Sequence, residues 1–74
     1  MLPVGIFIAN YENGQWTEPI PFPYNSLEFS NAHPALSPDG KMLVYSSTQP
    51  GGYGASDLYV SWFLNGEWTK PDNL

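Results

Sequence analysis

The apolar positions of this chain fall in short runs that are rich in β-branched and aromatic residues. No window of about 11 residues shows the apolar spacing of a helix, and eight prolines and seven glycines interrupt the chain. We therefore predict an all-β, antiparallel fold with about six strands. The predicted strands are residues 6–11, 15–17, 34–37, 42–47, 58–63 and 67–69.

Turn sequences separate these strands. The Asn-Gly pairs at 13–14 and 65–66 each predict a two-residue hairpin, because both central positions of a type I′ turn need positive φ. The sequence Ser-Pro-Asp-Gly at 37–40 predicts a tight turn. Residues 24–32 are predicted to be a polar connection, and residues 49–54 a Gly-rich loop.

A 17-residue segment occurs twice without gaps, first as Ile6–Phe22 and again as Leu58–Leu74. The offset is 52 residues, and the identical positions are Asn13/Asn65, Gly14/Gly66, Trp16/Trp68, Thr17/Thr69 and Pro19/Pro71. A period of this size predicts a repeat architecture. The prolines at 19, 21 and 23 are expected to end the first hairpin.

Charge and composition limit the partners. The formal net charge is −5, and the basic residues are Lys41 and Lys70. Nucleic acids and acidic membrane surfaces are bound through Lys and Arg, so neither partner is expected. The chain has no cysteine, which excludes disulfides and cysteine-based metal sites.

The apolar runs are too short for membrane insertion, because a spanning helix needs roughly 20 residues. The apolar N-terminus has no positive region and is interrupted by Pro3, so it is a poor signal peptide. If the protein is exported, we expect its signal to lie outside this chain.

Several motifs follow one another in the second half of the chain. They are HPALSPDGK at 33–41, LVYSS at 43–47, PGGYG at 50–54, DLYVS at 57–61, and GEW followed by PDNL within 66–74. Together they resemble a WD-like β-propeller repeat of the TolB type, as in exported envelope proteins of the OmpA family, which carry an OmpA-like peptidoglycan-binding domain. The resemblance covers one blade, about residues 30–74, and residues 6–22 resemble the outer two strands of a preceding blade.

The resemblance implies a domain organisation and a function. Residues 1–22 are expected to be half of a preceding blade, and residues 23–74 a connection and one complete four-stranded blade. The implied function is a non-catalytic binding or scaffold module for a protein or a cell-envelope glycan. The implied location is the periplasm or cell envelope, and no cofactor is implied.

Other interpretations stay open, because propeller repeats serve unrelated functions. The chain could be a propeller piece of an enzyme, either a prolyl-oligopeptidase-type hydrolase or a sugar lyase. It could also be a self-assembling repeat fragment without a ligand. A propeller needs at least about four blades to close, so one and a half blades are expected to self-associate through unpaired edges and an apolar sheet face.

His33 is the single histidine of the chain. A lone His without Cys partners is a poor metal site, and we expect no metal. In WD-type blades such a His often joins a hydroxyl and an aspartate in a structural network, and the resemblance implies Ser46 or Ser47 and Asp57 for these roles. The functional alternatives are a general base at His33 and a cation held by Asp57 with Asp72.

Aromatic residues supply the remaining candidates. Trp16 and Trp68 occupy equivalent repeat positions, which favours packing between sheets over a sugar-stacking platform. Trp62 corresponds to Asn10 in the repeat, so it is a candidate binding residue, with core packing as the alternative. Tyr53, at the tip of the Gly-rich loop, is a second candidate, because loops on rigid scaffolds often carry binding.

Catalytic residues are not expected. The chain has neither a Gly-x-Ser-x-Gly elbow nor a Cys nucleophile. The Gly-rich loop lacks the Lys and the following helix of a phosphate site. The four glutamates are scattered through turns and loops, with no pairing that the sequence establishes.

Overall fold

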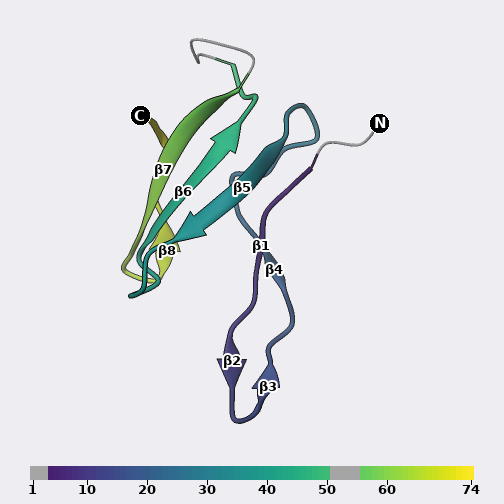
Figure 1. The fold of residues 1–74 in the computed structure, drawn as a ribbon, viewed down its shortest axis with the longest axis vertical. Helices are drawn as coiled ribbons and strands as arrows, with labels where there is room; N and C mark the ends of the chain where they lie inside the picture. Colours follow the sequence, from purple (N-terminus) through teal and green to yellow (C-terminus); the bar gives the residue numbers. More distant parts are fainter. Residues whose placement is uncertain (1–3, 51–55) are drawn as a thin grey trace.

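The computed structural model describes residues 4–50 and 56–74 (Figure 1). The strands in these ranges are β1 (Phe7–Ile8), β2 (Tyr11–Glu12), β3 (Gln15–Trp16), β4 (Ile20–Pro21), β5 (Asn31–Leu36), β6 (Met42–Ser47), β7 (Asp57–Leu64), β8 (Glu67–Trp68) and β9 (Asp72–Asn73). All of their pairings are antiparallel. The predicted all-β, antiparallel class is confirmed for the described residues.

β5, β6 and β7 lie side by side in chain order in one sheet (Figure 1). β8 and β9 both pair with β7, at opposite ends of that long strand, so together they fill the fourth position. We expected pairing to end before Pro71, but it resumes at Asp72 in β9. The described chain therefore has more strands than the six predicted, because the N-terminal hairpin and the C-terminal segment after β7 are divided into two-residue strands, whereas β5 and β7 are longer than predicted.

The N-terminal hairpin pairs β1 with β4 and β2 with β3. The prolines at 19, 21 and 23 were predicted to end this hairpin, but β4 contains Pro21 and pairs with β1, so pairing continues past Pro19. The Phe22 amide donates to the Ile6 carbonyl at 2.9 Å. Pro21 therefore sits in the next pair along, which is a non-hydrogen-bonded one, and its missing N–H costs no ladder bond.

The two 17-residue segments have the same local pairing. With the 52-residue offset, each strand pair of the N-terminal hairpin recurs in the C-terminal hairpin of β7, β8 and β9. The Thr17 amide donates to the Asn10 carbonyl at 2.6 Å, and the Thr69 amide donates to the Trp62 carbonyl at 2.8 Å. Each threonine hydroxyl also accepts from the amide of the same partner, at 2.8 and 3.0 Å.

Both hairpin turns adopt the predicted backbone. The central φ angles are 53° and 80° at Asn13 and Gly14, and 53° and 81° at Asn65 and Gly66. Positive φ at both positions is what a type I′ turn needs, and this turn matches the twist of the flanking strands. The prediction from the two Asn-Gly pairs is confirmed.

The turn between β5 and β6 is held by side-chain hydrogen bonds. The Gly40 amide donates to the Ser37 carbonyl at 2.9 Å, which closes the turn. The Ser37 hydroxyl donates to Asp39 Oδ1 at 2.6 Å, and the Lys41 amide donates to the same oxygen at 3.0 Å. These bonds hold the pKa of the exposed Asp39 carboxyl below its usual value. The presence of Asp39 at this position is therefore explained by the hydrogen bonds that its carboxylate accepts within the turn.

The first strand of the sheet starts earlier than the sequence indicated. β5 begins at Asn31, not Pro34, so the predicted connection ends at residue 30. A β-bulge interrupts the register between Ala32 and Ala35, and His33 within it has a φ of 53°. Histidine is one of the residues enriched at positive φ. The bulge interrupts the alternation of inward and outward side chains, so the sequence pattern did not indicate the first half of the strand.

Hydrogen bonds between side chains and the backbone hold the connection before β5 in place, and they come from Asn25 in the connection and from Asn31 at the start of β5. Asn25 Oδ1 accepts from the Ile6 amide at 3.0 Å, and Asn25 Nδ2 donates to the Ile6 carbonyl at 2.8 Å. Asn31 Nδ2 donates to the Tyr24 carbonyl at 3.1 Å. A Cβ at Gly5 would lie 3.0 Å from Asn25 Nδ2, so glycine permits this close approach.

The hydrophobic core lies between the N-terminal hairpin and one face of the sheet. Its buried side chains are Ile6, Phe22, Leu43, Tyr45 and Tyr59. Side chains alternate along a strand, so Leu43 and Tyr45 reach this face while Val44 between them does not. The Tyr45 ring meets Phe22 edge-on at 5.3 Å and stacks with Tyr59 at 6.2 Å. The hairpin and the sheet are thus joined through aromatic contacts.

Tyr45 yields a prediction about alkaline pH, because its phenol is buried and its hydroxyl has no partner among the described residues. Burial raises the pKa of Tyr45 above its usual value of 10.0. Above about pH 10 the unfolded chain releases this proton and the folded chain keeps it, so the free energy of unfolding falls as pH rises. We expect chemical denaturation to show a smaller fall for Tyr45→Phe.

At neutral pH we expect Tyr45→Phe to be at least as stable as the wild type, since the substitution removes a buried hydroxyl that has no partner. Denaturation at neutral pH is the matching measurement. A clear loss of stability there, or an unchanged alkaline slope, would contradict the structure around Tyr45.

Candidate functional site

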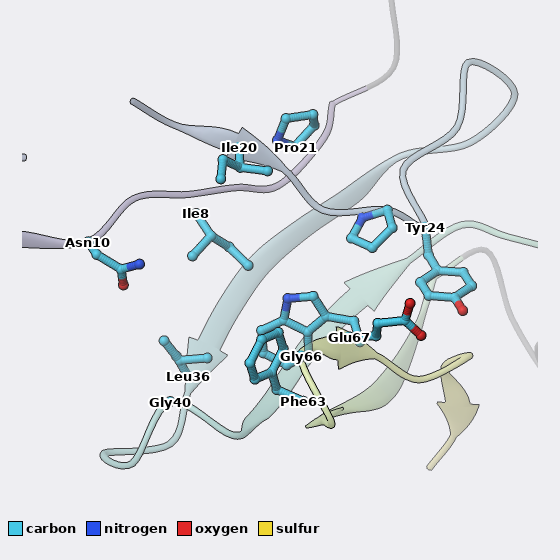
Figure 2. A pocket seen from close by; sticks show the side chains of 12 residues that line it. Ile8, Asn10, Ile20, Pro21, Tyr24, Leu36, Gly40, Phe63, Gly66 and Glu67 are labelled. Carbon is cyan, nitrogen blue, oxygen red and sulfur yellow. The ribbon is translucent and has the colours of Figure 1, made fainter. Parts of the chain in front are cut away.

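A cleft of about 740 Å³ opens between the N-terminal hairpin and one end of the sheet (Figure 2). Ile8 and Ile20 approach it from the hairpin, and Leu36 and Phe63 approach it from the sheet (Figure 2). The residues that line it are Ile8, Asn10, Ile20, Pro21, Pro23, Tyr24, Leu36, Gly40, Phe63, Gly66, Glu67 and Trp68. Most of these side chains are apolar or aromatic.

Strand pairing positions both walls of the cleft. Ile8 and Ile20 are direct partners across β1 and β4, so their side chains lie on the same side of the hairpin. Phe63 and Trp68 are partners across β7 and β8, and their ring centroids are 5.1 Å apart. One cross-strand pair of the N-terminal hairpin and one cross-strand pair of the sheet therefore supply the two walls of the cleft.

Polar side chains are few along this cleft. Asn10, Tyr24 and Glu67 supply an amide, a phenol and one carboxylate. Within residues 4–50 and 56–74, no group of three or more His, Cys, Asp or Glu residues could hold a metal ion. Apolar walls with a few polar groups are the usual composition of a site that binds a ligand. The arrangement can remove apolar ligand surface from water and offer it a small number of hydrogen bonds.

The residues expected to form a structural network lie on three neighbouring strands, His33 on β5, Ser46 on β6 and Asp57 on β7. The Ser46 hydroxyl donates to the Ala32 carbonyl at 3.1 Å, across the β5–β6 pair, and not to His33. His33 is exposed within the bulge of β5. Asp57 is the first residue of β7 and lies opposite Ser47. Ser46 thus supports the sheet ladder, beside the bulge that contains His33.

The two repeat tryptophans differ in burial. Trp68 packs against the core, with its ring centroid 5.9 Å from that of Phe22. Trp16 contacts Tyr11 at 5.1 Å, as Trp68 contacts Phe63, but Trp16 is 71% exposed. Figure 1 shows β2 and β3 at the end of the hairpin that extends away from the sheet. Packing of Trp16 between sheets stays a prediction that requires a surface outside the described chain.

Trp62, one of the two candidate binding residues, is not among the described residues that line the cleft. Trp62 is 43% exposed, and it points to the sheet face opposite the core because Tyr59, three residues earlier on β7, faces the core. Tyr53 lies outside the described residues. Trp62 therefore belongs to a second surface of the molecule.

Sequence reasoning missed the cleft because its walls come from segments far apart in the chain. Ile8 and Leu36 were assigned to strands, but nothing in the sequence indicates that these strand ends face each other. The one available signal was the apolar residue Ile20 between the prolines at 19 and 21, since an apolar side chain in a proline-rich segment needs a packing partner.

No family model, curated protein or solved structure matches this chain. None of the residues described here forms a helix with the length and apolarity that crossing a membrane requires.

Proposed function

We propose that this protein is a non-catalytic binding and scaffold module whose cleft takes an apolar segment of a protein partner. The composition of the cleft carries this proposal. Its walls are mainly isoleucine, leucine, proline and aromatic side chains, and its polar side chains are Asn10, Tyr24 and Glu67. Burying apolar surface there contributes about 25 cal/mol per Å² removed from water.

A protein segment suits this cleft better than a glycan does. The hydroxyls of a buried sugar need hydrogen-bond partners, since a buried polar group without one is costly. Three polar side chains in the lining satisfy few such groups. The paired rings of Phe63 and Trp68 present apolar surface that an aliphatic or aromatic side chain can cover.

We also propose that the fold is one and a half blades of a TolB-type propeller. Three observations support it: the sheet has four antiparallel positions, the two hairpins share one pairing pattern, and the motifs resemble that repeat. Residues 1–22 would then belong to a preceding blade and residues 23–74 to a connection and a complete one. A location in the periplasm or cell envelope rests on the resemblance alone.

Amide chemical shifts of the isotope-labelled protein test the cleft with two probes, indole and the trimer of N-acetylglucosamine. We expect indole to shift the amides of Ile8, Gly40 and Gly66, whereas the sugar leaves them unchanged. Shifts with the sugar alone would assign the cleft to a glycan instead. Indole shifts that miss the cleft would overturn the proposal.

Two variants make the test specific. Leu36→Glu puts a carboxylate into the cleft wall, and we expect at least a tenfold weaker response to indole. Leu27→Glu is the control, because Leu27 is highly exposed and lies outside the cleft lining. An unchanged indole response in Leu36→Glu would place the binding elsewhere.

A further inference from the structure

The contact between the N-terminal hairpin and the sheet has two different sides. The hairpin side, here called the covering face, consists of Ile6, Ile8 and Phe22. The sheet side, here called the receiving face, consists of Leu43, Tyr45, Tyr59 and Trp68. This contact shows which surface of one hairpin packs on which surface of its neighbour.

The C-terminal hairpin has residues at the positions equivalent to the covering face of the N-terminal hairpin. Adding the 52-residue offset to Ile6, Ile8 and Phe22 gives Leu58, Val60 and Leu74. The cross-strand bond is also equivalent, since the Leu74 amide donates to the Leu58 carbonyl at 2.9 Å, as Phe22 does to Ile6. Trp62 extends this second covering face, and Leu58, Trp62 and Leu74 remain exposed.

In the same way, the N-terminal hairpin has residues at positions equivalent to part of the receiving face. Tyr59 and Trp68 of this face correspond to Phe7 and Trp16, and Phe63, the strand partner of Trp68 beside the face, corresponds to Tyr11. Phe7 and Tyr11 are each 62% exposed, and Trp16 is 71% exposed. Leu43 and Tyr45 have no counterparts in this hairpin. The N-terminal hairpin thus presents the part of a receiving face that β7 and β8 supply in the sheet.

We propose that the second covering face of one molecule docks on the exposed receiving face of a second copy of this chain. The internal contact is the template, because the same structural positions already pack on each other within the molecule. The match is also chemical, since the exposed Leu58, Trp62 and Leu74 meet the rings of Phe7, Tyr11 and Trp16. Exposed apolar patches of this kind are typical of interaction sites.

The docking joins two different surfaces, so the interface is heterologous. Each added copy presents a further covering face, and the assembly grows head to tail unless the geometry closes a ring. The net charge of −5 makes the copies repel one another. We therefore expect added salt to strengthen the association, because screening weakens this repulsion and leaves the apolar contact intact.

Light scattering coupled to size exclusion tests the proposal through two single variants. Trp62→Glu disables the covering face, and Trp16→Glu disables the receiving face. We expect the wild type to exceed the monomer mass increasingly with concentration, and each variant alone to be a monomer. An equimolar mixture should form a dimer that grows no further, because only one intact face of each kind remains. Formation of that dimer also shows that both variants are folded.

Leu27→Glu is the matched control, since it adds the same charge to an exposed leucine that belongs to neither face. We expect it to associate as the wild type does. A wild type that stays monomeric up to about 1 mM, where even a weak interface is populated, would overturn the proposal. So would single variants that still associate, or a mixture that stays monomeric.

Discussion

Replacing Phe22 with alanine is expected to lower the free energy of unfolding by about 3–5 kcal/mol, the cost of deleting a large buried aromatic side chain. Phe22 is 1% exposed and lies where the N-terminal hairpin meets the sheet. Its ring centroid is 5.3 Å from that of Tyr45, 5.9 Å from Trp68 and 5.7 Å from Tyr24. One substitution therefore removes contacts to the hairpin connection and to two strands of the sheet.

The loss is large relative to what a chain of this size can hold. With about 0.05–0.15 kcal/mol per residue, 74 residues have a total stability of roughly 4–11 kcal/mol. Urea denaturation followed by tryptophan fluorescence measures the change. It should be done at low protein concentration, because association would add to the apparent stability.

Phe7→Ala is the control for this substitution. It removes the same side chain from the same hairpin, but Phe7 is 62% exposed on the side away from the core. We expect its cost to stay below about 1 kcal/mol, as for most exposed positions. Equal losses at Phe22 and Phe7 would mean that the hairpin does not pack on the sheet in solution.

Local signals in the sequence predicted the turns and the class of the fold well. Each Asn-Gly pair specifies its own backbone, because positive φ at two successive residues is available to few residue pairs. The strands at 42–47 and 58–63 were also evident, since β6 and β7 pair along their length and are rich in strand-forming residues.

Elements set by pairing alone were missed. Pro21 and Asp72 have poor strand propensity, and both still pair, because a hairpin turn fixes the register for the residues that follow it. The start of β5 was missed for a related reason. Its first residues pair with the end of β6, but the bulge at His33 breaks the two-residue alternation.

The candidate site depends on how the hairpin and the sheet pack on each other. The sequence repeat does not indicate this packing, because equivalent repeat positions can differ in burial. Trp16 and Trp68 have the same sequence neighbours and the same turn, yet only Trp68 is covered. The difference arises because the N-terminal hairpin covers the sheet and nothing described covers the N-terminal hairpin. The equivalent sequences of the two hairpins therefore predicted their strand pairing correctly. The burial of each tryptophan depends instead on whether another element packs against its hairpin.

This pair of tryptophans supports the second large prediction. Trp68→Ala is expected to cost about 3 kcal/mol, at the lower end of the range for buried aromatics because Trp68 is only partly buried. Trp16→Ala should cost about 1 kcal/mol, mainly from its lost ring contact with Tyr11. The intra-hairpin ring contacts have the same centroid distance, 5.1 Å, so they largely cancel in the comparison. The difference between the variants isolates the packing of the N-terminal hairpin on Trp68.

A double-mutant cycle identifies the origin of that difference. If Trp68 is stabilised through Phe22, Trp68→Ala should cost less by about 1 kcal/mol or more in a Phe22→Ala background, as expected for residues in contact. Trp16→Ala should cost the same in both backgrounds, because Trp16 lies outside the core that Phe22 joins. Equal costs for Trp68→Ala and Trp16→Ala in the wild type would show that neither is covered, and the stacking of the hairpin on the sheet would be wrong. A coupling energy with Phe22 that is found for Trp68 and not for Trp16 would establish that the hairpin's covering face and the sheet's receiving face meet in solution. The proposed head-to-tail assembly repeats this same contact between molecules.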